Sequence, residues 1–129
     1  MVSVKELSWE EFLKMKSGSM PMLKLNVVTA SMAPLIPVGS TVVVDTAAPY
    51  LVHDIIVFWH NKKLIVHILW SINRSVRRGE QEILVTRALN SKVVDTSINK
   101  EQILGRVINF KLSWFNLLNL YVIKRIKRY

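Results

Sequence analysis

Residues 29–44 read Thr-Ala-Ser-Met-Ala-Pro-Leu-Ile-Pro-Val-Gly-Ser-Thr-Val-Val-Val. This run places a small hydroxyl side chain, Ser31, in a loop that leads into a β-branched strand. Pro34 and Pro37 restrict the backbone on either side of residues 35–36, because proline fixes its own φ and limits the residue before it. We therefore expect Ser31 to be held in a defined position beside a sheet.

Outward from this loop, short β-branched runs alternate with turn-forming or charged residues, a pattern typical of strands. The expected strands are 24–29, 41–45, 55–59, 64–69, 82–86 and 104–110. Residues 74–80 indicate a hairpin tip, and residues 97–102 indicate one helical turn. The pattern predicts a mainly β core over residues 22–110, either a compact β barrel or a folded sheet.

The two ends of the chain have helical patterns. Ser8-Trp9-Glu10-Glu11 is a capping-box sequence, which predicts a short helix ending near Lys16. Residues 1–21 are therefore expected to form an N-terminal helical appendage. Residues 111–129 are expected to form an amphipathic, basic C-terminal helix.

Composition limits the possible chemistry and partners. The 129 residues suit one domain, and half of them are hydrophobic, which is enough for a core. The chain has no cysteine, so a disulfide, a thiolate zinc site and a cysteine nucleophile are all excluded. The net charge of +9 predicts an anionic partner. Nucleic acid is not expected, because residues 1–21 cannot house a helix-turn-helix domain and the basic residues do not alternate with aromatic ones.

A membrane surface is the other anionic candidate. Residues 112–123 form the longest apolar-rich run, about 12 residues, which is short of the ~20 that span a bilayer. No secretory signal is recognisable at the N-terminus. We expect a cytoplasmic or peripheral membrane protein, in which residues 112–129 form either an interfacial helix beside the basic tail or a helix packed on the core.

Several segments together resemble the signal peptidases and the LexA-like self-cleaving repressors. The Ser31-Met32-Ala33-Pro34 segment, with Gly39 eight residues after the serine, is similar to the Ser-Met-x-Pro box of these families. An earlier Ser19-Met20-Pro21 lacks the correct spacing. The remaining similar segments, in the family order within about residues 24–108, are His53-Asp54-Ile55-Ile56-Val57-Phe58, Ile65-Val66-His67-Ile68-Leu69, Thr86-Arg87-Ala88-Leu89-Asn90 with Asp95, and Ile103-Leu104-Gly105-Arg106-Val107.

The resemblance implies roles for particular residues. Ser31 matches the nucleophile and His67 the general base, as in the archaeal and endoplasmic-reticulum type; bacterial signal peptidases have lysine there. A serine hydroxyl needs such a base at neutral pH. Asp95 matches an aspartate that would orient the imidazole. The Ser31 backbone N–H and the Thr29 hydroxyl would stabilise the oxyanion.

Two positions depart from the family pattern. Leu89 replaces the first aspartate of the acidic box, and Ile68 replaces an arginine that commonly follows the base. The expected function is a serine endopeptidase that cleaves an extended leader or signal-like peptide through an acyl-enzyme. The alternative is a catalytically impaired homologue that acts as a peptide-binding or accessory module, and a non-peptidase barrel with a coincidental motif is a third possibility.

The expected partner is a peptide or protein substrate laid along exposed strand edges. The residues expected to line its path are Val27, Val28, Leu64 and Ile65. No metal site is expected, because His53, His60 and His67 are seven residues apart and do not converge on strands of period two. No cofactor is expected, since glycines do not cluster into a phosphate-binding motif.

Overall fold

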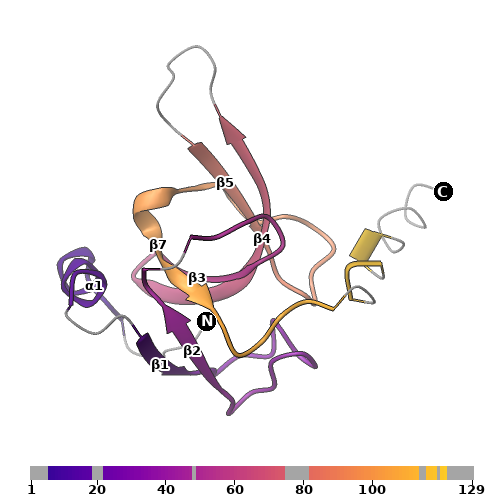
Figure 1. The fold of residues 1–129 in the computed structure, drawn as a ribbon, viewed down its shortest axis with the longest axis horizontal. Coiled ribbons are helices and arrows are strands. Elements are labelled where there is room, and N and C mark those ends of the chain that lie inside the picture. The colour runs from indigo at the N-terminus through magenta and orange to yellow at the C-terminus, as the bar shows by residue number, and fades with distance from the viewer. Residues whose placement is uncertain are drawn as a thin grey trace.

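A computed structural model describes residues 6–18, 22–47, 49–74, 82–113, 116–118 and 120–121. The fold is mainly β (Figure 1). Its strands form one antiparallel sheet in the order β1-β2-β7-β3-β4-β5-β6. The elements are α1 (Trp9–Lys16), β1 (Met22–Asn26), β2 (Thr41–Asp45), β3 (Ile55–His60), β4 (Lys63–Arg74), β5 (Glu82–Arg87), β6 (Ile98–Asn99), the 3₁₀ helix η1 (Lys100–Gln102) and β7 (Ile103–Val107).

The sheet is open. Within the described strands β1 and β6 are the two edges and do not pair, so the sheet does not close into a barrel. Of the two predicted forms, the folded sheet agrees with the structure and the barrel does not. The strands of the predicted mainly β core are present. The helical turn predicted at residues 97–102 is present as η1. The predicted hairpin tip at 74–80 lies, apart from Arg74, outside the described residues.

Two strands are shorter than the sequence predicts. β1 ends at Asn26 because the ladder leaves its register at the next residue, where Gly39 N–H rather than Ser40 N–H donates to Val27 O over 2.9 Å. β7 stops at Val107 because the Asn109 side chain takes over the pairing with β2. Its Oδ1 accepts from Val43 N–H over 2.8 Å.

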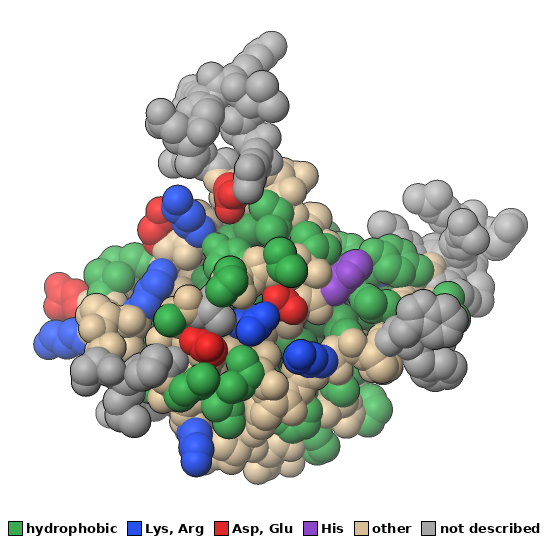
Figure 2. Space-filling model, in the orientation of Figure 1, with side chains coloured by type: hydrophobic (Ala, Val, Ile, Leu, Met, Phe, Trp, Pro, Cys, Tyr) green, Lys and Arg blue, Asp and Glu red, His purple; other side chains and the backbone are tan. Residues whose placement is uncertain are grey.

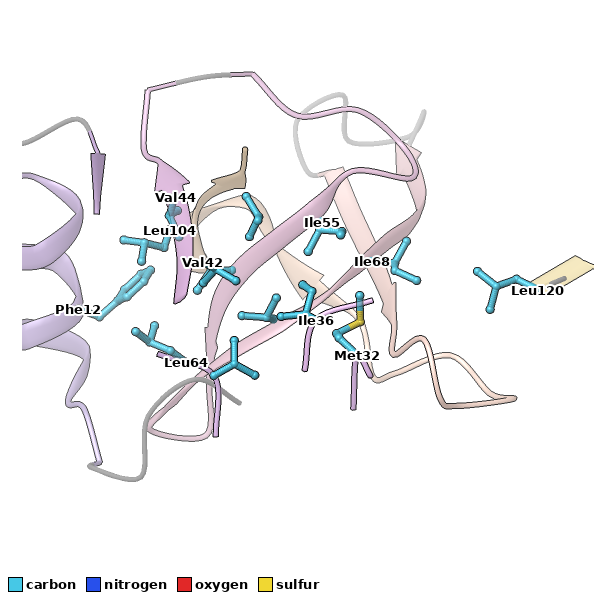
Figure 3. Close-up of a cluster of buried hydrophobic side chains, with 14 residues drawn as sticks. Phe12, Met32, Ile36, Val42, Val44, Ile55, Leu64, Ile68, Leu104 and Leu120 are labelled. Atoms are coloured by element: carbon cyan, nitrogen blue, oxygen red, sulfur yellow. The ribbon is translucent and has the colours of Figure 1, made fainter. Parts of the chain in front are cut away.

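Strand alternation divides the apolar side chains between two faces. Along β4, Val66 and Ile68 enter the main core, whereas Leu69 enters a smaller core on the other face. Figure 3 shows the main core extending from Phe12 at one end to Leu120 at the other. The buried members of the smaller core are Ile56, Phe58, Leu69, Leu84, Ile98 and Ile103.

Helix α1 is packed against the sheet. Ser8 and Glu11 form the predicted capping box, and Phe12 is fully buried in the main core. The Trp59 indole N–H donates to Leu7 O over 2.7 Å, and the Trp9 ring lies 5.1 Å from the Trp59 ring. These contacts tie the N-terminal segment to the β3–β4 hairpin.

The C-terminal segment lies at the opposite end of the molecule from α1 (Figure 1). Residues 111–113 are not helical, so the helix predicted for 111–129 begins later than expected. Ser113 caps it, since its Oγ accepts from Asn116 N–H over 3.1 Å. Residues 116–118 and 120–121 are helical, and most of the remaining tail lies outside the described residues. No described helix has the length and apolar character needed to cross a membrane.

Candidate active site

Ser31 lies in the loop that joins β1 to β2. The base of the loop is closed by two backbone hydrogen bonds of 2.9 Å, from Val27 N–H to Ser40 O and from Gly39 N–H to Val27 O. Gly39 has a φ of 91°, which glycine adopts readily and other residues do not. The loop is therefore fixed where it leaves the sheet.

The loop is also fixed around the serine itself. Ile36 N–H donates to Met32 O over 2.8 Å, and the Ala33–Pro34 peptide bond is cis. Met32 and Ile36 are buried in the main core, whereas Ser31 is only partly buried (Figure 3 shows Met32 beside Ile36 and Ile68). The two buried side chains anchor a loop from which Ser31 remains accessible.

A second attachment joins this loop to the segment after β5. Asn90 N–H donates to Ser31 O over 3.1 Å, and its Nδ2 donates to Ala30 O over 2.6 Å. Leu89 N–H lies 3.3 Å from Met32 Sδ. Hydrogen bonds between residues about 60 positions apart in the sequence therefore fix the backbone around Ser31.

His67 lies in the middle of β4, opposite Ile56 of β3, on the side of the smaller core. Its side chain is 13% exposed, and its ring lies 6.0 Å from the Phe58 ring. The Nδ1 atom is 2.5 Å from Asp95 Oδ2. Because a carboxylate only accepts, the Nδ1 proton points at Asp95 and the lone pair of a neutral ring is on Nε2.

Burial lowers the pKa of His67 below the ordinary histidine value, and the attraction of Asp95 opposes that shift. The imidazole is therefore neutral at neutral pH. A neutral imidazole with its lone pair on Nε2 is the form that a general base requires.

Asp95 is itself held by Thr86, near the end of β5. Thr86 Oγ1 donates to Asp95 Oδ2 over 2.7 Å, and Asp95 N–H donates to Thr86 O over 2.8 Å. Thr86 is completely buried. No role for Thr86 follows from the sequence pattern alone, although a threonine at an inward strand position needs a hydrogen-bond partner and so carries a signal.

The structure brings His67 and Asp95 together but forms no hydrogen bond between Ser31 and His67 in the described part of the chain. The Ser31 hydroxyl instead lies 3.4 Å from Thr29 Oγ1. Both halves of the site are nevertheless tied to one segment, residues 86–95, through Asn90 on one side and Asp95 on the other.

The four residues expected along the substrate path have different environments. Val27 and Leu64 are 4% and 2% exposed and belong to the main core. Val28 is partly buried, and Ile65 packs against the smaller core while remaining partly exposed. Side-chain contact with a peptide is therefore open to Val28 and Ile65, whereas the side chains of Val27 and Leu64 are buried.

The two positions that depart from the family pattern are apolar for a visible reason. Ile68 is fully buried in the main core, and Leu89 packs against that core. Both side chains contribute to packing.

His53 belongs to an aromatic cluster with Trp70 and Tyr121 that the sequence pattern does not indicate. Its Nε2 is 3.0 Å from the Tyr121 hydroxyl, and the Tyr121 ring lies 5.1 Å from the Trp70 ring. The Arg87 guanidinium lies 4.8 Å from the centre of the Trp70 ring. No three metal-ligating side chains gather anywhere in the described ranges.

The chain was compared with models of protein families, with curated proteins and with solved structures, and none of them matches it.

Proposed function

We propose that this chain is a serine endopeptidase of the signal-peptidase and LexA type. The observation that carries the proposal is the chain of hydrogen bonds from His67 Nδ1 to Asp95 Oδ2 and from Thr86 Oγ1 to the same oxygen. These three residues come from different parts of the sequence, and together they hold a neutral, oriented imidazole, which is the arrangement that a general base needs.

In the proposed reaction, Ser31 Oγ attacks the carbonyl carbon of the scissile peptide bond and its proton passes to His67 Nε2. Asp95 stabilises the imidazolium that forms. The Ser31 backbone N–H and the Thr29 hydroxyl stabilise the oxyanion of the tetrahedral intermediate. The imidazolium then gives its proton to the leaving amine, which leaves an acyl ester on Ser31.

Water completes the cycle. His67 Nε2 accepts a proton from a water molecule, whose oxygen attacks the ester carbonyl. The ester bond to Ser31 Oγ breaks, and the imidazolium returns the proton to the serine. The product is a peptide with a free carboxyl group, and the enzyme returns to its starting state.

In this proposal, the Ser31 hydroxyl and the His67 imidazole form their hydrogen bond when substrate binds. Catalytic hydrogen bonds are often long in a substrate-free site and shorten in the complex. Ser31 is partly buried on a loop anchored by Met32 and Asn90, and its hydroxyl lies beside Thr29, so the proposed reaction requires substrate binding to turn the hydroxyl toward His67. An extended peptide along Val28 and Ile65 would shield that pair from water.

A second candidate function is favoured by one observation, the absence of a Ser31–His67 hydrogen bond in the described site. A catalytically impaired homologue would retain the peptide path and act as a binding or accessory module. The apolar Leu89 and Ile68 are consistent with that role, because they remove two polar supports that the resemblance implies.

We also propose peripheral contact with a membrane through residues 112–129. Leu118 and Tyr121 are 44% and 45% exposed, and the chain ends with four basic residues among its last six. On the face shown in Figure 2, by contrast, Lys and Arg side chains are scattered among hydrophobic and polar ones. Exposed apolar side chains followed in the sequence by four basic residues suit an anionic bilayer surface.

Active-site labelling tests the peptidase proposal. A serine-reactive phosphonate is expected to add once, at Ser31, with a rate that rises with pH while His67 loses its proton below about pH 6.5 and then levels off. Ser31→Ala and His67→Gln should abolish the adduct, whereas Ser97→Ala and His60→Gln, at exposed sites, should not. An unlabelled wild-type chain would instead support the accessory module.

A further inference from the structure

Thr86 is one of two polar residues that are buried in the described chain, and it is the one beside the candidate site. It pairs across the β4–β5 ladder with Leu69, which is two residues from His67 on the same side of β4. Its hydroxyl therefore emerges on the His67 side of the sheet. A buried hydroxyl must find an acceptor, and here the acceptor is Asp95.

We propose that Thr86 is a positioning residue that holds the Asp95 carboxylate against His67 and thereby fixes the tautomer and orientation of the imidazole. The role rests on the proposed function of His67 as the general base. Thr86 is fully buried, so it acts through Asp95 and has no surface to present to a peptide.

Asp95 needs such support because no strand holds it. It lies in the irregular segment 91–97, next to the exposed Val93 and Val94, and its own side chain is 32% exposed. The side-chain bond and the backbone bond to Thr86 form a two-point attachment that faces the carboxylate inward. Without the hydroxyl, the bond to His67 would be the remaining side-chain hydrogen bond of the described carboxylate, which would then turn toward water more often.

Substitution of Thr86 by valine removes the hydroxyl and keeps the shape. Asp95 would then oppose the effect of burial on His67 less strongly, so the pKa of His67 should fall below that of the wild type. The labelling rate of Ser31 should fall by about 10-fold, which is a typical effect of losing a residue that orients an active-site side chain. Thr86→Ser keeps a hydroxyl and should restore both properties.

The decisive experiment is an NMR titration of the His67 imidazole in the wild type, Thr86→Val and Thr86→Ser, with Thr41→Val as an exposed control. This titration needs no substrate, so it tests the role of Thr86 separately from the peptidase proposal. The peptidase proposal is tested by the labelling of Ser31. Thr86→Cys, a weak donor of similar size, replaces the valine variant if that variant does not fold.

Two results would overturn the role of Thr86. One is a His67 titration that is unchanged or moved to higher pH in the valine or cysteine variant. The other comes from the Asp95→Asn background, where a residue that acts through Asp95 should have lost its influence. A further shift caused by Thr86→Val in that background contradicts the proposal.

Discussion

The two halves of the candidate site are built in different ways. The base half lies on strands: His67 is in the β3–β4 ladder, and its partner Asp95 is held by Thr86 of β5. The nucleophile half lies on a loop, where backbone bonds from Asn90 and buried Met32 fix the chain but leave the Ser31 hydroxyl beside Thr29. In the proposed mechanism, therefore, the sheet orients the base before substrate arrives, and substrate binding aligns the nucleophile.

Breaking the base half should have the largest effect. Asp95→Asn retains the shape but no longer fixes the His67 tautomer, so peptidase and labelling rates should fall by ~10⁴-fold. Labelling kinetics measure this directly. Asp45→Asn, at the end of β2 and outside the site, is the matched control. A loss below 10-fold would mean that Asp95 is not the orienting acid.

The frame that carries both halves is most sensitive at Gly105 of β7. A Cβ there would lie 2.4 Å from Asp45 O and 2.9 Å from the Asp45 carbonyl carbon, and backbone cannot yield as a side chain does. Gly105→Ala should therefore lower the free energy of unfolding by about 3 kcal/mol, measured by denaturant unfolding.

The control for that prediction is Gly18→Ala. Gly18 is exposed at the end of α1, and an added Cβ would meet its nearest atoms at 3.4 Å or more. Its unfolding free energy should change by less than about 1 kcal/mol. Equal losses at both glycines would show that the β2–β7 approach is not as close as described.

The nucleophile half is tested at Asn90. Asn90→Ala removes the Nδ2 bond to Ala30 O but leaves the backbone bond to Ser31, so the loop should be aligned less often. We expect about a 10-fold slower labelling of Ser31, with the His67 titration unchanged. Asn73→Ala, at an exposed position of β4, is the control. A moved His67 titration would show that the two halves are not independent.

Much of this arrangement was predictable from local patterns. β-branched runs predicted β2, β3 and β5 closely, because short runs of β-branched residues bounded by turn-forming residues are a local signal of strands. The capping box predicted α1, because all the bonds that begin a helix are local. Resemblance gave Asp95 and His67 as partners, although they lie 28 positions apart.

The remaining features depend on contacts that local patterns do not encode. Whether the sheet closes depends on the pairing of its edges, and the two-residue β6 is too short to have a periodic signal. The end of β7 depends on the Asn109 side chain, which pairs with β2 in place of backbone. Thr86 gains its role only because an irregular segment returns Asp95 to β5.

The smallest expected effect is on the pH dependence of stability, which should distinguish the largely buried His67 from the exposed His60. In the unfolded chain His67 has its ordinary pKa of about 6.5, and in the folded chain burial lowers that pKa. Between the two values the unfolded state binds more protons, so stability should fall as pH falls below about 6.5. Thermal unfolding should show a decrease in Tm on the order of a few °C over this window.

His67→Gln should reduce that decrease, whereas His60→Gln, on the exposed end of β3, should leave it intact. An equal pH dependence in His67→Gln and the wild type would mean that His67 titrates as freely as a surface group and is not prepared as a base by the fold.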